Sequence, residues 1–243
     1  MSSLKHQTDS LFHFNILINV KKTEQLNCQF TAIDLRLEKK HYFCTQILQT
    51  MHDIEPWYGW RDYYAAEEDR FSPFYGRQYD EFVFTNKIYN HYIHPQWDDF
   101  GSETLYIKLL YVDYEQSFAA IELIGEWNDC IENDIMFFKR DVVDFLLKKK
   151  IYHYVLFCDN VLNYHGDDDS YYEEWYEDVK DHDGWICLVN TFEHVEKEMR
   201  KYRLHHYMFF DENLNEMNWR SKNPNLLKEE MENIIFSDPK FLK

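Results

Sequence analysis

The stretch between residues 159 and 183 has the strongest chemical character in this sequence. It holds ten acidic residues and one lysine, a net charge of −9, which is half of the net charge of −18 of the 243-residue chain. Clustered carboxylates attract cationic surfaces and hard metal ions. We therefore expect this stretch to bind a basic protein surface, through the residues Asp159, Asp167, Asp168, Asp169, Ser170 and Glu173.

Two other interpretations of the same stretch stay open. The acids at 167–169 precede an expected helix, where they would complement the positive end of the helix dipole, with Ser170 as the N-cap and Glu173 completing a capping box. A cation site is the other interpretation, although the spacing does not match an EF-hand loop, because the glycine precedes the acids. The weak candidates for such a metal site are His165, Asp167 and Asp169.

Other residues could also do chemistry. His91 and His94 stand three positions apart on an expected helix, a spacing that can place two imidazoles on one face for zinc, but no third ligand is identifiable. A pair of carboxylates of the kind that cleaves glycosides stays open, because the sequence does not place the acids relative to one another. The acids considered for it are Glu122, Glu126, Asp129 and Glu174.

Motifs of common enzyme classes are missing from the sequence. It contains no GxGxxG, GxxxxGK[ST], HExxH or GxSxG, and its six glycines leave little room for a phosphate-binding loop. We therefore expect no cofactor, and the sequence favours a protein that is not an enzyme.

The elements that must position these residues are regular after residue 100. Residues 105–114 and 118–127 indicate two strands of a hairpin, and a helix follows from Ile135 to the lysines at 148–150. Strands at 152–158, 185–189 and 206–210 alternate with helices. One helix is expected to begin at an Asn190 cap with Glu193 three residues on, and the last begins at Asn223 and Pro224. The order ββαβαβα predicts a mixed α/β fold with a mainly parallel sheet.

The C-terminal half resembles STAS domains, the modules of anti-sigma-factor antagonists and sulfate-transporter tails. The resemblance rests on the strand at 186–190, the helix through Tyr202 and the strand at 206–210, and it spans roughly residues 104–236. The pair Asp169 and Ser170 is similar to the loop that holds the phosphorylatable serine of that family, although Tyr171 and Tyr172 stand where the family has a small residue and glycine. The resemblance implies a STAS-like unit with a regulatory role.

The first hundred residues have a different pattern. Residues 12–20 and 28–36 predict a hairpin, and residues 42–52 a helix. Between Trp57 and Phe100 stand 15 of the 45 aromatic residues, interleaved with arginines, which indicates either a segment that packs over the sheet or an aromatic ligand cleft. We therefore expect two parts, residues 1–100 and a STAS-like domain over residues 101–243.

Composition limits the partners. The net charge of −18 argues against binding a nucleic-acid backbone, and no apolar run reaches the roughly 18 residues that a spanning helix needs. Five widely spaced cysteines without a CxxC pair indicate buried reduced thiols, and the N-terminus has no signal-like pattern, so we expect a cytoplasmic protein.

These features predict a regulatory or protein-interaction module that is not an enzyme and that uses its acidic loop. The alternative is a metal-dependent enzyme with a site between the aromatic segment and the acidic loop. A third hypothesis, mimicry of nucleic acid by spaced carboxylates, fits less well because the charge is concentrated in one stretch.

Overall fold

The computed structural model describes residues 54–89 and 91–237. The chain divides into two compact units, Met1–Leu48 and Gln49–Lys243, and every described residue belongs to the second. The hairpin and helix expected within residues 12–52 lie outside the described residues. A domain boundary near residue 100 stays a prediction.

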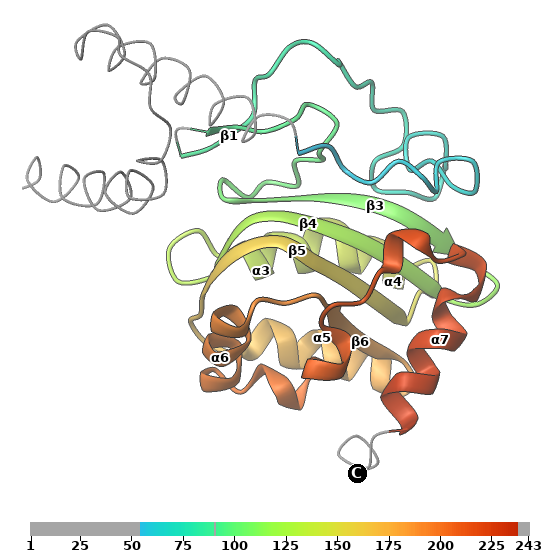
Figure 1. Cartoon of the computed structure of the whole chain (residues 1–243), viewed down its shortest axis with the longest axis vertical. Coiled ribbons are helices and arrows are strands. Elements are labelled where there is room, and N and C mark those ends of the chain that lie inside the picture. The colour runs from blue at the N-terminus through green and yellow to red at the C-terminus, as the bar shows by residue number, and fades with distance from the viewer. Residues whose placement is uncertain (1–53, 90, 238–243) are drawn as a thin grey trace, which may run out of the picture. The chain divides into compact units, whose positions relative to one another are not determined.

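A four-stranded mixed sheet forms the centre of the described residues (Figure 1). The strands β3 (Leu105–Asp113) and β4 (Phe118–Asn128) form the expected antiparallel hairpin. The strands β5 (His153–His165) and β6 (Trp185–Val189) follow in parallel, in the order β3-β4-β5-β6. The predicted mixed α/β class with a mainly parallel sheet is therefore confirmed.

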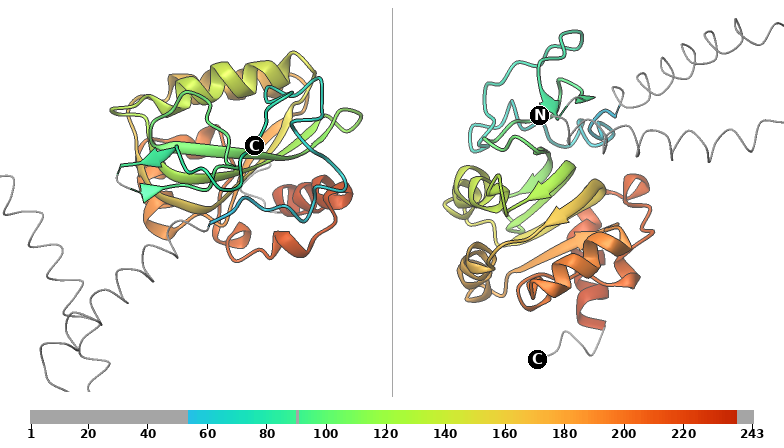
Figure 2. Two further views of the ribbon diagram at one scale, coloured as in Figure 1. Left: turned by 90° about the horizontal axis from the view of Figure 1, so that it is seen from above. Right: turned by 90° about the vertical axis from the view of Figure 1, so that its left-hand side faces the viewer.

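Helices lie on both faces of this sheet, as Figure 2 shows. An apolar layer of buried side chains covers each face. One layer holds a continuous helical segment made of α3 (Asp134–Phe137), the π-helical η1 (Phe138–Val143) and α4 (Asp144–Leu147). The helices α5 (Ser170–Lys180) and α6 (Glu193–Lys201) contribute to the same layer. On the other face lies α7 (Pro224–Ser237), whose Leu227, Met231 and Ile235 are fully buried. No helix among the described residues is both long and apolar enough to cross a membrane.

The aromatic segment packs around the outer edge of β3. The backbone of Asp98 exchanges two hydrogen bonds with Ile107 of that strand, 2.8 and 3.1 Å long. Phe74 and Phe100 belong to the core on one face of the sheet, and Trp60 belongs to the core on the other. The segment therefore contributes aromatic side chains to both faces, which fits a packing role.

Two elements expected from the sequence are wrong. Residues 206–210 do not form a strand: Leu204–His206 is a 3₁₀ turn (η2), and only Phe209 bridges to Cys187 of β6. Asn190 does not cap α6, which begins after Phe192. The Asn190 side chain is held instead by the backbone of Met217, through hydrogen bonds of 2.8 and 2.9 Å.

The arrangement expected for His91 and His94 also differs from the structure. The segments β1 (Lys87–Ile88) and β2 (His91–Tyr92) form a short antiparallel pair, so His91 lies on a strand and His94 follows it in a loop. The expected helix with two imidazoles on one face is therefore wrong. His94 is buried and its Nε2 lies 3.6 Å from a carboxylate oxygen of Glu55.

The described cysteines are free thiols. Cys158 and Cys187 are buried in the sheet, as expected, and burial raises the pKa of the Cys158 thiol to about 12. Cys130 is exposed, against that expectation, because it follows the end of β4 in a surface turn.

Gly125 on β4 provides a test of the sheet. Its backbone has a φ of 123°, a value that residues with a side chain rarely adopt. A Cβ added there would lie 2.2 Å from the backbone oxygen of Thr104. We expect Gly125→Ala to lower the free energy of unfolding by about 2 to 4 kcal/mol, measured by urea denaturation. Gly76→Ala is the matched control, because its φ is also positive but nothing lies within 4 Å of the added carbon. Equal losses in the two variants would contradict this account.

Candidate functional site

The acidic loop (residues 166–169) connects the carboxyl end of β5 to the first residue of α5. Asp167 and Asp168 are exposed. The carboxylate of Asp168 accepts hydrogen bonds from the hydroxyl and from the backbone N–H of Ser170, the latter 2.9 Å long, and these bonds lower the pKa of Asp168. The acidic loop therefore follows the carboxyl end of a parallel strand.

Asp169 fixes this loop to the rest of the molecule. Its carboxylate lies 2.9 Å from the guanidinium of Arg203 and accepts a hydrogen bond of 3.3 Å from the Tyr207 hydroxyl. Both partners belong to the turn that follows α6. The loop is therefore held at one carboxylate while its other two face solvent.

The expected capping box is wrong. The N-cap of α5 is Asp169, and its side chain makes no capping hydrogen bond. Ser170 is the first helical residue, and its hydroxyl donates to Asp168 instead. Glu173 is exposed, lies in the first turn and forms none of the ion pairs found among the described residues. Three exposed carboxylates thus gather at the positive end of the helix dipole, those of Asp167, Asp168 and Glu173.

The structure separates Asp159 from the other predicted binding residues. Asp159 lies on β5, and its carboxylate accepts hydrogen bonds from Asn190 (3.1 Å), Trp219 Nε1 (2.9 Å) and Arg220 Nη1 (3.0 Å). The same guanidinium also binds Glu122 of β4, at 2.8 Å. Arg220 therefore bridges two carboxylates on neighbouring strands, and we call Glu122, Asp159 and Arg220 the arginine bridge.

Glu122 is the most deeply buried member of the arginine bridge. Its side chain is only 1% exposed, and its second oxygen accepts the backbone N–H of Trp57 at 2.7 Å. Burial raises the pKa of Glu122 to about 7, although the hydrogen bonds from Trp57 and Arg220 act in the opposite direction. The sequence offered a weak signal for this residue, a charged side chain inside a mostly apolar strand, and no signal for Arg220.

A second buried carboxylate stands after the end of β4. Asp129 accepts hydrogen bonds from the hydroxyls of Tyr172 (2.5 Å) and Tyr164 (3.1 Å) and from the backbone N–H of Ile135 (2.9 Å). Burial raises the pKa of Asp129 to about 7. Because its bonds fasten the start of one helix to a neighbouring helix and strand, this carboxylate serves the fold.

The four acids considered for glycoside cleavage have different partners. Glu122 binds Arg220, Asp129 binds two tyrosines, and Glu174 binds Arg140 through two hydrogen bonds of 2.6 and 2.8 Å. Glu126 accepts hydrogen bonds from Tyr89 and Asn163. We find no common substrate-facing arrangement of the four among these contacts.

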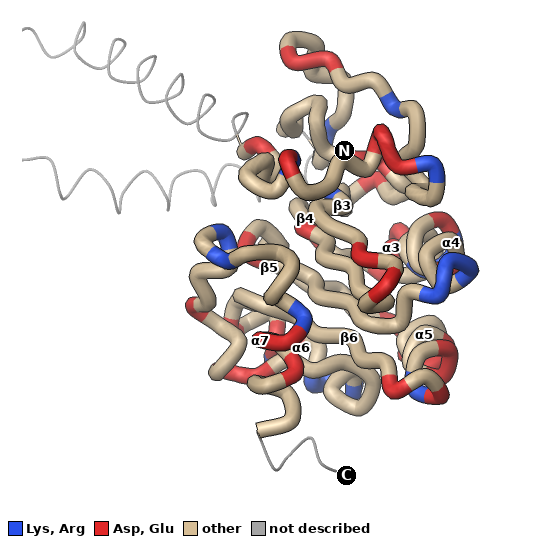
Figure 3. The backbone as a smooth tube through the Cα atoms, turned by 90° about the vertical axis from the view of Figure 1, so that its right-hand side faces the viewer, with Lys and Arg blue, Asp and Glu red and all other residues tan. Residues whose placement is uncertain are grey.

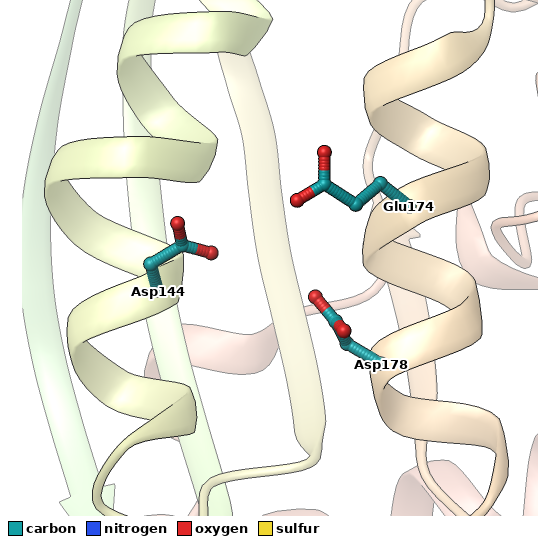
Figure 4. A group of neighbouring side chains, drawn as sticks. All are labelled: Asp144, Glu174 and Asp178. Atoms are coloured by element: carbon teal, nitrogen blue, oxygen red, sulfur yellow. The ribbon is translucent and has the colours of Figure 1, made fainter.

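The expected metal candidates do not meet. The one group among the described residues with metal-ligand spacing is Asp144, Glu174 and Asp178, whose oxygens lie within 4.8 Å of one another, and it includes none of His165, Asp167 and Asp169. Figure 4 shows the carboxylate of Asp144 facing the other two across the space between two helices. The metal-dependent alternative stays a prediction.

The ammonium of Lys139 lies among these three carboxylates. Its side chain is 1% exposed, and its ammonium forms ion pairs with Asp144, with Asp178 (2.9 Å) and with Glu174 (3.4 Å). Burial lowers the pKa of Lys139, but hydrogen bonds from its ammonium to Asp144 and Asp178 outweigh burial and keep the pKa above its ordinary value. The ammonium therefore supplies one positive charge among the three carboxylates.

The aromatic segment borders a small cavity that no residue of the acidic loop lines. Its cavity, lined by Trp57, Tyr64 and Tyr79 of the segment and by Lys108 of β3, holds about 30 Å³, enough for a few water molecules at most. The contacts of the acidic loop run to Arg203 and Tyr207 instead.

Part of this chain is similar to a protein of known structure. No family model and no curated protein sequence matches the chain significantly. A solved structure from Thermotoga maritima, described as a proposed anti-sigma factor antagonist, matches with 21% identity over 51% of this chain and 91% of its own, with a TM-score of 0.34. Anti-sigma factor antagonists are the class of protein whose STAS modules the C-terminal half of this sequence resembles.

Glu122 gives a testable pH dependence. Because its folded pKa of about 7 lies above the ordinary value of 4.5, the folded state binds more protons than the unfolded state between these values. Its contribution to the free energy of unfolding therefore falls as pH rises from about 5 to 7, by about 3 kcal/mol in all. Glu122→Gln, which keeps an oxygen for the Trp57 N–H, should remove that part of the slope in urea denaturation at pH 5, 6, 7 and 8. A variant with the slope of the wild type would refute the assignment.

Lys139 gives a second test. Lys139→Met leaves three facing carboxylates without their buried counter-charge, and we expect a loss of about 3 kcal/mol or more in unfolding free energy at pH 7. Lys180→Met is the control, because Lys180 is exposed and pairs with Glu177 on the surface, where an ion pair contributes less than about 1 kcal/mol. Similar losses in the two variants would show that the Lys139 cluster has no special role.

Proposed function

We propose that this chain is a regulatory, protein-binding module that docks a basic surface of another protein through the acidic loop and the first turn of α5. The observation that carries the proposal is the group of exposed carboxylates of Asp167, Asp168 and Glu173, none of which forms an ion pair among the described residues. Ser170 stands between them and is exposed.

The way the loop is held supports this proposal. Asp169 anchors the loop to Arg203 and Tyr207. Because the loop is already fixed there, binding a partner through the remaining carboxylates costs little conformational entropy. Asp159 has a different role, because its carboxylate is already occupied by Arg220 and Trp219. Figure 3 shows acidic residues along α5.

The net charge supports a protein partner with a basic surface. A chain of net charge −18 repels nucleic-acid phosphates at long range and attracts cationic proteins. Attraction of this kind is screened at high ionic strength, because the Debye length falls to roughly 4 Å near 0.5 M salt.

A capture experiment tests the proposal. The whole chain serves as bait at 0.1 M NaCl, and the retained proteins are quantified for the wild type and for the variant Asp167→Asn, Asp168→Asn, Glu173→Gln. We expect the variant, and the wild type at 0.5 M NaCl, to lose most of the basic proteins retained.

A charge-matched variant makes this experiment specific. Glu115→Gln, Asp181→Asn, Glu229→Gln removes three exposed acids outside the loop, so it changes the net charge by the same amount. We expect it to retain the partners. Equal losses in both variants, or binding that persists in the loop variant, would overturn the proposal.

A further inference from the structure

The turn formed by residues 129–133, which we call the Ile131 turn, lies beside the acidic loop. The turn follows the end of β4 and the loop follows the end of β5, and because these strands are parallel, both segments leave the same end of the sheet (Figure 1). The backbone N–H groups of Asp129 and Cys130 donate to the backbone oxygen of His165, at 2.9 and 3.2 Å. Because His165 directly precedes the acidic loop, these bonds hold the two segments side by side.

Ile131 is exposed on this turn although its side chain is aliphatic. It is 77% exposed, so it contributes almost nothing to the core. Its backbone is nevertheless fixed, because its N–H donates to the side-chain oxygen of Asn128 at 3.1 Å and the N–H of Glu132 donates to the backbone oxygen of Asn128 at 3.3 Å. A partner that covers Ile131 therefore meets a side chain on an ordered backbone, and binding costs little backbone entropy.

Tyr89 adds a second exposed side chain with an apolar body near the turn. It is 60% exposed, and its hydroxyl donates to Glu126 at 2.8 Å. The pKa of Tyr89 is raised, chiefly by this hydrogen bond, and the charge of Glu132 contributes to the rise, which places that residue of the turn near Tyr89. Glu132, like Asp167 and Asp168, forms none of the ion pairs found among the described residues.

We propose that Ile131 is the apolar anchor of the docking surface and contacts an aliphatic side chain of the basic partner, one that is flanked by lysine or arginine. A few apolar anchors carry most of the affinity of a protein interface, whereas exposed ion pairs contribute little by themselves. The carboxylates of the turn and of the acidic loop favour cations next to that aliphatic side chain. This inference rests on the proposed function and adds the chemistry of the partner.

The test uses the whole chain labelled with ¹⁵N and two peptides of equal charge. One is acetyl-Arg-Lys-Leu-Lys-Arg-amide, and the other has serine in place of leucine. The amide signals of the acidic loop give the dissociation constant of each peptide at 0.1 M NaCl. We expect the leucine peptide to bind roughly fivefold more tightly, as partial burial of one aliphatic side chain implies. In Ile131→Ser the two peptides should bind equally.

Leu226→Ser is the matched control for this variant. Leu226 is 52% exposed on α7, outside both the Ile131 turn and the acidic loop, so this variant should keep the preference for leucine. Because Ile131 is exposed, Ile131→Ser should unfold at the same urea concentration as the wild type. A lost preference then reports docking and not a change in the fold.

The loop variant Asp167→Asn, Asp168→Asn, Glu173→Gln separates this inference from the proposed function, and it should weaken both peptides. Equal binding of the two peptides that is lost in the loop variant overturns the anchor and upholds the loop. A leucine preference that survives in Ile131→Ser, or no binding of either peptide, also overturns the anchor. A preference that is lost in Ile131→Ser, with unchanged affinities in the loop variant, upholds the anchor and overturns the proposed role of the loop.

Discussion

The arginine bridge is the interaction on which the arrangement of the described residues depends. Glu122 and Asp159 place two carboxylates on one face of neighbouring strands, where burial makes isolated charges very costly. Arg220 forms an ion pair with each of them and lies over the ring of Trp219, 4.2 Å from its centre, and Trp219 in turn stacks on Phe157 of β5. Because Glu122 also accepts the N–H of Trp57, one guanidinium joins the start of the aromatic segment, the centre of the sheet and the turn before α7.

Much of the fold was predictable from sequence, because apolar spacing reports which side of an element is buried. The strand β6 was expected at the residues it occupies, and the helix from Ile135 was expected from the spacing of Phe138, Val142 and Leu146, all of which are fully buried. The strand expected at 206–210 was wrong because alternating apolar residues do not specify hydrogen-bond partners: Met208 and Phe210 are buried, but only Phe209 pairs with the sheet. The helix cap expected at Asn190 was wrong for a related reason. The Asn190 amide donates hydrogen bonds to Asp159 and Met217, which are distant in sequence.

The candidate site was predictable in part. Local charge located the acidic loop, and the loop does follow the end of a parallel strand. The arginine bridge was not predictable, because Arg220 is 98 residues from Glu122 and 61 from Asp159, and no local pattern relates them. The same holds for Lys139, whose inward position arises in a π-helical turn that the spacing of apolar residues does not reveal.

The number of acidic residues in the sequence is larger than the number of carboxylates that a partner would find outside ion pairs on this protein. Of the ten acids between residues 159 and 183, five form ion pairs: Asp159 with Arg220, Asp169 with Arg203, Glu174 with Arg140 and Lys139, Glu177 with Lys180, and Asp178 with Lys139. The other five acids form none of the ion pairs found among the described residues, and they lie near the two ends of α5. Asp181 and Asp183 stand at the negative end of the helix dipole, whereas Asp167, Asp168 and Glu173 stand at the positive end, which stabilises their charge. Of the whole acidic stretch, the proposed docking surface therefore comprises only the three carboxylates near the loop that these ion pairs leave out.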